Sequence, residues 1–226
     1  MSGYGQFCAI ARAHEVLGGR WTLLVVRELL MGSRRFNDIR RGIPRISRTM
    51  LSERLRELVE VGAVLRYASG RGPEYDLTEA GRDLMEPLIA LGSWGQRWLP
   101  RKAQAEDIDL DPLLVDMQRR VNFAGLPKAP LVVRFEIDRQ RPRFLLLKPG
   151  EAAACAENPG FPEGLVVRGR LAALIGWWRG DTDFAGAQRA GLKLEGARAL
   201  VRAFPGWFQL YLLADIGPAR GREGKK

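Results

Sequence analysis

The segment Gly32–Leu77 reads GSRRFNDIRRGIPRISRTMLSERLRELVEVGAVLRYASGRGPEYDL and decides the fold of the first half of the chain. Ser33 is placed to cap a short helix, and that helix is expected to end at Gly42 because Pro44 blocks its continuation. Ser47 is placed to cap a second, longer helix. The segment therefore predicts two helices joined by a tight turn.

The helix after Ser47 is predicted to have one apolar face. Leu51, Leu55 and Leu58 recur at helical spacing and are expected to point inward. Gly62 is placed to end the helix in a left-handed cap. The opposite face is free to contact another molecule. It carries Arg48, Thr49, Ser52, Glu53 and Arg56.

A hairpin is predicted after this helix, because the apolar pattern changes from helical spacing to alternation at Val64 and Leu65. The expected turn consists of Ser69, Gly70, Gly72 and Pro73, and the second strand of Tyr75 to Leu77. Two helices followed by a hairpin are typical of a winged helix-turn-helix, whose second helix enters the DNA major groove. The stretch 34–56 holds eight arginines and two carboxylates, a net charge of +6. Double-stranded DNA is therefore the expected partner.

Three groups of residues are expected to contact DNA, through base edges, phosphates or the flanking backbone. From the recognition helix they are Ser47, Arg48, Thr49, Ser52 and Arg56; from the first helix and its approach, Arg34, Arg35, Asn37, Arg40 and Arg41; from the wing, Arg66 and Arg71. Any single exposed arginine can also be merely solvated, so the prediction rests on the group.

Several motifs in this half resemble the HxlR-type winged helix transcriptional regulators of bacteria. They are CAIARAHEVLGGRW at 8–21, RRF at 34–36, LSERLREL at 51–58 and YDLTEAG at 75–81, and together they cover residues 5–98. The resemblance implies a homodimer that represses or activates transcription.

Composition is compatible with one or two globular domains and excludes few functions. The net charge is +10, and both halves of the chain are basic. A polyanion partner fits this charge, although a generally arginine-rich chain would show it too. No basic-then-apolar signal segment opens the sequence, and its apolar runs are too short to span a bilayer, so we expect a cytoplasmic protein. Cys8 and Cys155 suggest neither a disulfide framework nor a metal site.

Three further helices are predicted around the helix-turn-helix, at Phe7–Leu17, Trp21–Met31 and Thr78–Trp98. The second of them is expected to be buried beneath the helix pair. The apolar residues of the third exceed what a small core needs, so a dimer interface is expected there, with the first helix as an additional part. Its predicted members are Phe7, Ile10, Leu84, Leu88, Leu91, Trp94 and Trp98. Packing against a second domain is the alternative.

The predicted domains are a winged helix at 1–100, a linker at 101–111, an α+β domain at 112–216 and a disordered basic tail at 217–226. In the third segment, Asp111 and Pro112 are placed to start a helix. The strands expected after it are Leu131–Ile137, Arg143–Lys148, Ala152–Ala156, Leu165–Arg170 and Leu192–Glu195; the expected helices are Leu171–Arg179, Asp183–Ala190 and Ala197–Phe204. The fold class is therefore α+β, with a sheet covered by helices.

The second half resembles the sterol-carrier-protein-like domains that follow HxlR-type winged helices in some bacterial regulators. The residues that carry the likeness are Gly150–Cys155, Pro159, Gly160, Leu165–Val167, Trp178, Gly180, Asp181 and GLKLEGARALVRAFPGW at 191–207. The resemblance covers residues 110–212 and implies an apolar cavity that binds a hydrophobic small molecule.

Large aromatic side chains are the expected lining of such a cavity, although each can equally fill a core. The candidates are Phe135, Phe144, Phe161, Trp177, Trp178, Phe184 and Phe204. Neighbours on a helix point about 100° apart, so Trp177 and Trp178 are not both expected in one small core. One of them should face a cavity, a partner or the other domain.

No catalytic function is expected, and no metal or cofactor. His14 is the only histidine and lies in the first predicted helix, while P-loop, GxGxxG and HExxH motifs are missing from the sequence. Cys8 lies where a cysteine serves as the sensor in some HxlR-type regulators, which makes it a candidate for sensing oxidants or electrophiles. A small buried side chain is the alternative for Cys8. For the whole chain, the alternative function is a carrier of lipids with an accessory basic domain.

Overall fold

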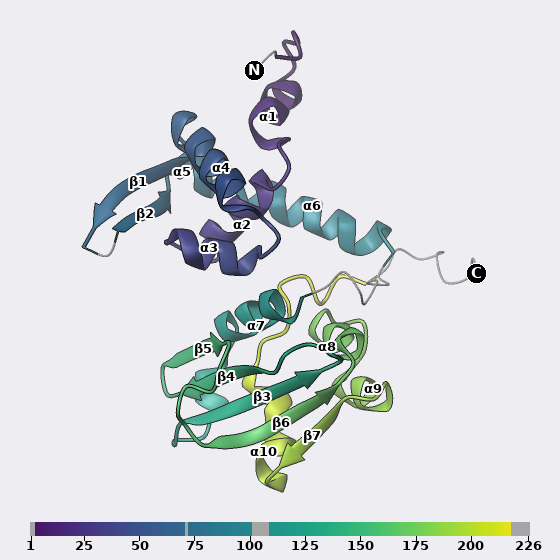
Figure 1. Cartoon of the computed structure of the whole chain (residues 1–226). Coiled ribbons are helices and arrows are strands. Elements are labelled where there is room, and N and C mark those ends of the chain that lie inside the picture. Colours follow the sequence, from purple (N-terminus) through teal and green to yellow (C-terminus); the bar gives the residue numbers. More distant parts are fainter. Residues whose placement is uncertain (1–2, 71, 101–108, 218–226) are drawn as a thin grey trace. The chain divides into compact units, whose positions relative to one another are not determined.

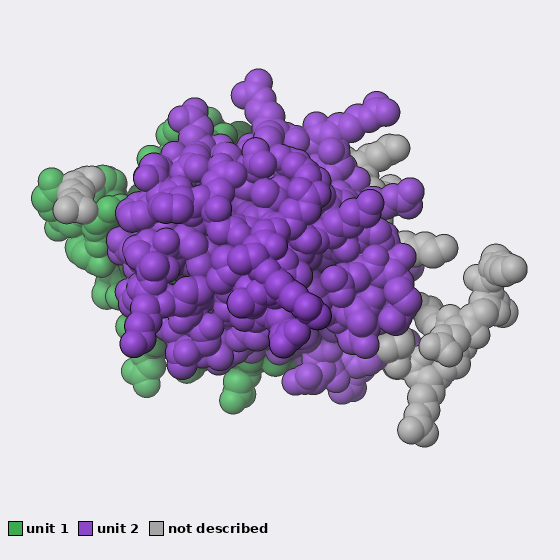
Figure 2. All heavy atoms as spheres, turned by 90° about the horizontal axis from the view of Figure 1, so that it is seen from below, with its two compact units in different colours: residues 1–91 green, residues 92–226 purple. Residues whose placement is uncertain are grey.

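The computed structural model describes residues 3–70, 72–100 and 109–217. The chain divides into two compact units, residues 1–91 and 92–226 (Figures 1 and 2). Each unit has its own hydrophobic core. Among the described residues, no helix is both long and apolar enough to cross a membrane.

The domain limits expected from the sequence remain a prediction. Arg71, residues 101–108 of the expected linker and residues 218–226 of the expected tail lie outside the described residues.

The first unit contains the predicted helices and hairpin. Its elements are α1 (Ala9–Leu17), α2 (Thr22–Leu30), α3 (Phe36–Gly42), α4 (Arg48–Glu60), β1 (Val64–Ser69), β2 (Gly72–Leu77), α5 (Glu79–Arg82) and α6 (Met85–Trp98), of which α6 continues into the second unit. Helix α2 is buried as expected, with Val25, Val26 and Leu29 in the core beneath α3 and α4. The winged helix-turn-helix arrangement is thus present.

The boundaries of α4 agree with the sequence prediction. The Ser47 hydroxyl accepts a hydrogen bond from the Met50 amide at 3.1 Å, which caps the helix. Leu51, Leu55 and Leu58 are buried. At the other end Gly62 has a φ of 74°, and its amide donates to the Val59 carbonyl, so a left-handed glycine closes the helix.

The predicted cap of α3 by Ser33 is wrong. Arg35 precedes the helix, and no side chain caps it. The backbone before α3 is extended instead, because Arg35 forms a β-bridge with Glu74 and the Tyr75 amide donates to the Arg34 carbonyl at 2.8 Å. This short segment is therefore held by the second strand of the wing. The wing turn is also tighter than expected, because Ser69 pairs directly with Gly72.

The single helix expected from Thr78 to Trp98 is interrupted. Thr78 caps only α5, where its hydroxyl accepts from the Gly81 amide at 3.2 Å. Asp83 and Leu84 then form a turn before α6. The cause is Pro87, which has no amide to donate to the carbonyl of Asp83 and whose ring crowds that carbonyl.

The second unit is a five-stranded sheet with helices, so the mixed α+β class is confirmed. Its elements are α7 (Leu110–Arg119), η2 (Phe123–Gly125), β3 (Leu131–Ile137), β4 (Arg143–Lys148), β5 (Glu151–Cys155), β6 (Glu163–Gly169), α8 (Leu171–Trp178), α9 (Phe184–Arg189), β7 (Lys193–Gly196), α10 (Arg198–Ala203) and η3 (Phe204–Trp207). The strands lie in the order β5-β4-β3-β6-β7, as Figure 1 shows. Of the strand pairs that the described residues form in this sheet, only β3–β6 is parallel.

The start of α7 differs from the expected cap at Asp111. The helix begins at Leu110, two residues before the expected first residue Pro112. The carboxylate of Asp111 is instead used in a contact with β4, where it pairs with Nε of Arg143 at 2.5 Å. The inward residues of α7 are as predicted, since Leu114 and Met117 are buried.

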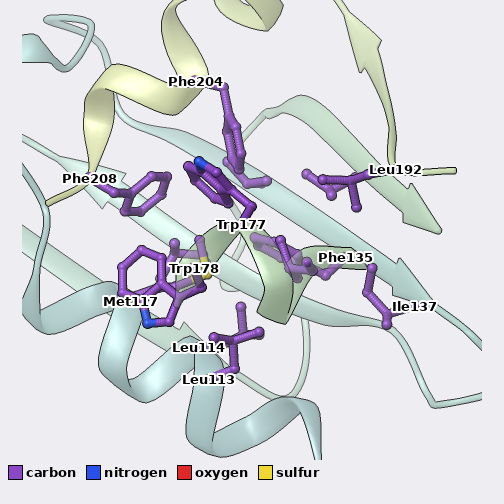
Figure 3. Close-up of a cluster of buried hydrophobic side chains, with 14 of the residues drawn as sticks. Leu113, Leu114, Met117, Phe135, Ile137, Trp177, Trp178, Leu192, Phe204 and Phe208 are labelled. Carbon is purple, nitrogen blue, oxygen red and sulfur yellow. The ribbon is translucent and has the colours of Figure 1, made fainter. Parts of the chain in front are cut away.

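Both tryptophans of α8 are buried in one core, contrary to the sequence expectation (Figure 3). The ring of Trp177 packs edge-on against Phe184, with centroids 5.0 Å apart. The indole N–H of Trp178 donates to Oδ2 of Asp116 on α7 at 2.7 Å. Both can be buried because α8 is apolar around most of its circumference and is enclosed by the sheet, α7 and η3.

Candidate nucleic-acid interface

The outer face of α4 exposes hydroxyl and guanidinium groups. Leu51, Leu55 and Leu58 fix the opposite face in the core, so the polar side chains must point outward. The structure places all five predicted recognition-helix residues on the exposed side. They are Ser47, Arg48, Thr49, Ser52 and Arg56. This face has the size and chemistry to enter a major groove.

Contacts within the unit hold two of these side chains loosely. The guanidinium of Arg48 lies over the ring of Phe36 at 6.0 Å from its centroid. Nε of Arg56 lies 3.6 Å from Oε1 of Glu60, one helical turn away, and both side chains are well exposed. Exposed pairs of this kind contribute little and exchange easily for a phosphate. Ser47 accepts a backbone hydrogen bond but keeps its own O–H to donate.

Helix α3 supplies further cationic groups near the start of α4. Asn37 and Arg41 are exposed, and Arg41 lies 3.7 Å from Asp38 in an exposed pair. Arg40 is half-buried, and its Nε has no hydrogen-bond partner among the described residues. These three side chains remain candidates for phosphate contact.

Arg34 and Arg35 are engaged with the wing rather than free. Nη1 of Arg34 donates to the Leu29 carbonyl at 2.9 Å, and its Nη2 lies 3.2 Å from Asp76. Nε of Arg35 donates to Oε1 of Glu74 at 3.0 Å. Both predicted phosphate-binding arginines thus tie the segment before α3 to β2.

Glu74 is a functional candidate that the sequence reasoning missed. Besides Arg35, its carboxylate accepts from the hydroxyls of Ser69 at 3.1 Å and Tyr67 at 3.3 Å. The hydrogen bond from Arg35 holds the pKa of Glu74 below its ordinary value, while partial burial and the Glu74 charge raise the pKa of Tyr67. The available signal was the alternation of β2, which places Glu74 opposite Tyr67.

The helix pair itself is fixed by another residue that the sequence reasoning missed. Glu28 on α2 is buried, and its carboxylate accepts from Nη2 of Arg27 at 2.7 Å. A Cβ placed on Gly42 would lie 2.0 Å from Oε2 of Glu28. Only glycine at the end of α3 permits this close approach.

On the wing, Arg66 lies on β1 with an exposed side chain. The other predicted wing contact, Arg71, falls outside the described residues. The exposed position of Arg66 is compatible with contact to the flanking backbone or minor groove.

The predicted dimer residues divide into two groups. Leu84 and Leu88 pack against the core of the first unit. Phe7, which precedes α1, and Ile10 in its first turn are exposed, as are Leu91, Trp94 and Trp98 on α6. Neither α1 nor α6 contains a buried residue.

Cys8 lies directly before α1 as a free, half-buried thiol. Cys155 is also half-buried and lies at the end of β5. A sensing role for Cys8 remains a prediction.

The structure brings together five of the seven predicted ligand-binding aromatics. They are Phe135, Trp177, Trp178, Phe184 and Phe204. All five belong to the core of the second unit, in which Figure 3 labels Phe135, Trp177, Trp178 and Phe204. The ring centroids of Phe184 and Phe204 are 5.9 Å apart. Phe144 and Phe161 are half-buried and do not belong to this cluster.

The helix pair with a buried α2, an exposed polar α4 and a paired wing defines the first unit as a winged helix-turn-helix. Comparison with known proteins is in agreement, since the family model described as HxlR-like helix-turn-helix matches residues 16–103. The chain belongs to the HxlR-like helix-turn-helix family.

Two relatives and one solved structure illustrate the match. The HTH-type transcriptional regulator YdeP of Bacillus subtilis is 33% identical over 97 residues, covering 42% of this chain and 76% of that protein. The regulator Rv3095 of Mycobacterium tuberculosis is 48% identical over 96 residues, and the match spans 41% of this chain and 60% of that protein. The reduced form of the transcriptional regulator YodB from B. subtilis is 31% identical, covers 43% of this chain and 100% of that chain, and has a TM-score of 0.38. The family model ends at residue 103, so the sterol-carrier-like nature of the second unit remains a prediction.

Proposed function

We propose that this protein is a homodimeric transcriptional regulator that binds a pseudopalindromic operator through α4 and the wing. The observation that carries the proposal is the exposed face of α4, where Arg48, Thr49, Ser52 and Arg56 point outward from a leucine-anchored helix. Arginine can read guanine through two hydrogen bonds, and hydroxyls can bind phosphates or base edges. Arg40, Arg41 and Arg66 would contact the backbone on either side.

Dimerisation is supported by the apolar surface of α1 and α6. Side chains such as Phe7, Ile10 and Trp94 leave a large apolar area in water, which a second copy would cover. A two-fold dimer presents two recognition helices to half-sites whose centres are about one helical turn, or a multiple, apart.

Selection of bound sequences from random duplex DNA, followed by hydroxyl-radical footprinting, tests this function. Two half-sites related by two-fold symmetry are expected. A single asymmetric half-site would contradict the dimer, and failure to select any sequence would contradict DNA binding. Specific binding should weaken steeply with rising salt yet keep its preference for the selected site. If the protein were instead a lipid carrier with an accessory basic domain, rising salt would weaken its binding to all DNA sequences equally.

The second unit is proposed to bind a hydrophobic small molecule that changes the spacing or mobility of the winged helices. This proposal is supported by the resemblance to sterol-carrier-like domains and by the aromatic cluster on one face of the sheet. A ligand would have to separate rings that now pack closely, such as Trp177 and Phe184.

Native mass spectrometry of the purified protein tests this part of the proposal. A dimer with additional apolar mass is expected, and the retained molecule can then be tested for release of DNA. A dimer without added mass, and with no mass gained from a lipid extract, would contradict ligand binding and favour sensing through Cys8.

A further inference from the structure

Glu74 is an acidic residue on a surface that is proposed to bind a polyanion. Its charge should repel phosphate, so its presence in the middle of the wing, opposite Tyr67, requires an explanation. The side chain is only 17% exposed and uses both carboxylate oxygens: Oε1 accepts from Arg35 and Ser69, and Oε2 accepts from Tyr67.

The partners of Glu74 come from both sides of the wing. Tyr67 and Ser69 lie on β1, and Tyr67 is directly opposite Glu74 in the strand register. Arg35 immediately precedes α3 and is 39 residues away in the sequence. One carboxylate therefore joins the two strands of the wing to the segment that leads into the helix pair.

A second arginine–carboxylate pair runs parallel to the first. Nη2 of Arg34 lies 3.2 Å from Oδ1 of Asp76, and Nη1 of Arg34 donates to the carbonyl of Leu29 at the end of α2. Between the two pairs, the Tyr75 amide donates to the Arg34 carbonyl. The wing is thus fixed relative to α2 and α3 by alternating side-chain and backbone contacts.

We infer that Glu74 is a positioning residue for DNA binding: it holds Arg35, Tyr67 and Ser69 so that the wing stays at a fixed distance from α4. This inference rests on the proposed DNA-binding function. According to this inference, the main role of Arg35 is to hold the wing through Glu74, and it is not an independent phosphate contact. A fixed wing binds DNA without an added ordering cost, so its loss weakens binding even when no contact to DNA is removed.

The substitution Glu74→Gln distinguishes this role from simple electrostatics. If Arg35 bound phosphate directly, removal of the Glu74 charge would release it and leave affinity equal or higher. If Glu74 positions the wing, affinity for the selected operator falls about fivefold, because an arginine pair and two hydroxyl contacts are weakened together. Footprint protection is then lost at the operator flanks and kept in the major groove at the half-site centres. Unchanged or tighter binding would overturn the inference.

Glu79→Gln is the matched control, because Glu79 is exposed at the start of α5 and has the same charge. It should keep the wild-type affinity and flank protection. The double variant Arg35→Gln/Glu74→Gln should bind no more weakly than the weaker single variant. Additive losses would mean that Arg35 and Glu74 act separately and would contradict the inference.

Tyr67→Phe provides a milder second variant should Glu74→Gln fail to fold. Removal of one hydroxyl should weaken operator binding about twofold with partial loss of flank protection, since one modest hydrogen bond is lost. No change in either measurement would overturn the inference.

Hydrogen exchange separates a failure of this inference from a failure of the proposed function. The Tyr75 amide should exchange faster in Glu74→Gln than in Glu79→Gln, with or without DNA. If the wild-type protein selects no operator but Tyr75 responds in this way, DNA binding fails as the function and the structural part of the inference holds. If Tyr75 exchanges equally in both variants, Glu74 does not hold the wing.

Discussion

The two units use their arginines in different ways. On α4 of the winged helix, Arg48 and Arg56 are exposed and make only loose contacts. On the sheet of the second unit, Arg168 is bound between Glu136 and Glu195, and both carboxylates raise its pKa. The comparison shows that high arginine content alone does not define a surface for a polyanion. What matters is how closely the neighbouring carboxylates hold the arginines.

The helices also differ in how far their apolar residues are buried. Helix α8 buries six of its eight residues in the second unit. Helices α1 and α6 bury none, although α6 displays Leu91 and Trp94 at helical spacing. The apolar residues of α8 are thus covered within the second unit, whereas those exposed on α1 and α6 are suited to a partner.

The largest expected effect tests whether the core of the second unit is independent of the first. Phe135 is fully buried on β3, so Phe135→Ala should destabilise the second unit by about 3–5 kcal/mol through lost contacts and a residual cavity. Chemical denaturation followed by hydrogen-exchange mass spectrometry measures this loss unit by unit. Amides of the first unit should keep their protection. Phe123→Ala, at an exposed ring, is the control. If the amides of both units lost protection from exchange equally, the two units would unfold as one cooperative structure and could not be compared as independent parts.

Truncation of an exposed ring on α6 should affect association and leave folding intact. Trp94→Ala is expected to weaken the dimer by about 2 kcal/mol or more, because large aromatic anchors dominate interface energies. Sedimentation velocity across a dilution series measures the dissociation constant, again with Phe123→Ala as the control. A dimer as tight as wild type would place the interface elsewhere and leave the apolar surface of α6 unexplained.

The arginine comparison is sharpened by a pair of matched substitutions. Arg48→Ala should weaken specific operator binding by about 1–3 kcal/mol, because a side chain that reads a base edge is lost. Arg189→Ala, at an exposed site on α9 of the second unit, should leave it unchanged. Fluorescence anisotropy at two salt concentrations provides both affinities. Equal affinity of wild type and Arg48→Ala for the operator would remove Arg48 from the interface.

Local patterns in the sequence were sufficient to predict most elements. The strands Leu131–Ile137 and Arg143–Lys148 were predicted with the observed limits, and the cap at Ser47 and the left-handed Gly62 are confirmed. The strands follow from the periodicity of their apolar residues. The cap and the helix end follow from a hydrogen bond of Ser47 and the backbone angle of Gly62, both of which are determined by neighbouring residues. Pro87 was an equally local signal for the break before α6, and the sequence interpretation overlooked it.

The errors share a different cause, since they depend on contacts between distant segments. Asp111 is engaged by Arg143 across 32 residues, so it is not available for the helix cap that its local sequence suggests. Arg35 is engaged by Glu74, which the local sequence did not indicate, and its phosphate contact remains a prediction. Trp178 is buried because Asp116, 62 residues earlier, accepts its indole N–H. Nothing in the local pattern of charges or rings identifies such partners. All of the DNA-contact residues remain predictions for a related reason, since the contacts that define them are made to another molecule.

The smallest expected effect concerns the acid stability of the second unit. The hydrogen bond from Arg168, with the nearby charge of Arg134, holds the pKa of Glu136 below its ordinary value of 4.5. Because the folded pKa is lowered, the pair stabilises the unit fully above pH 4.5 and loses this contribution as the pH falls through the folded value. The urea midpoint of the wild type should therefore fall more between neutral and acid pH than that of Glu136→Gln. The difference should be small, since both side chains are partly exposed and salt screens them. Glu157→Gln, at an exposed site after β5, should follow the wild type. The same acid dependence of the urea midpoint in Glu136→Gln and wild type would contradict this prediction. The ion pairs of Arg168 would then contribute no more to the stability of the second unit than the exposed arginines of α4 contribute to that of the first.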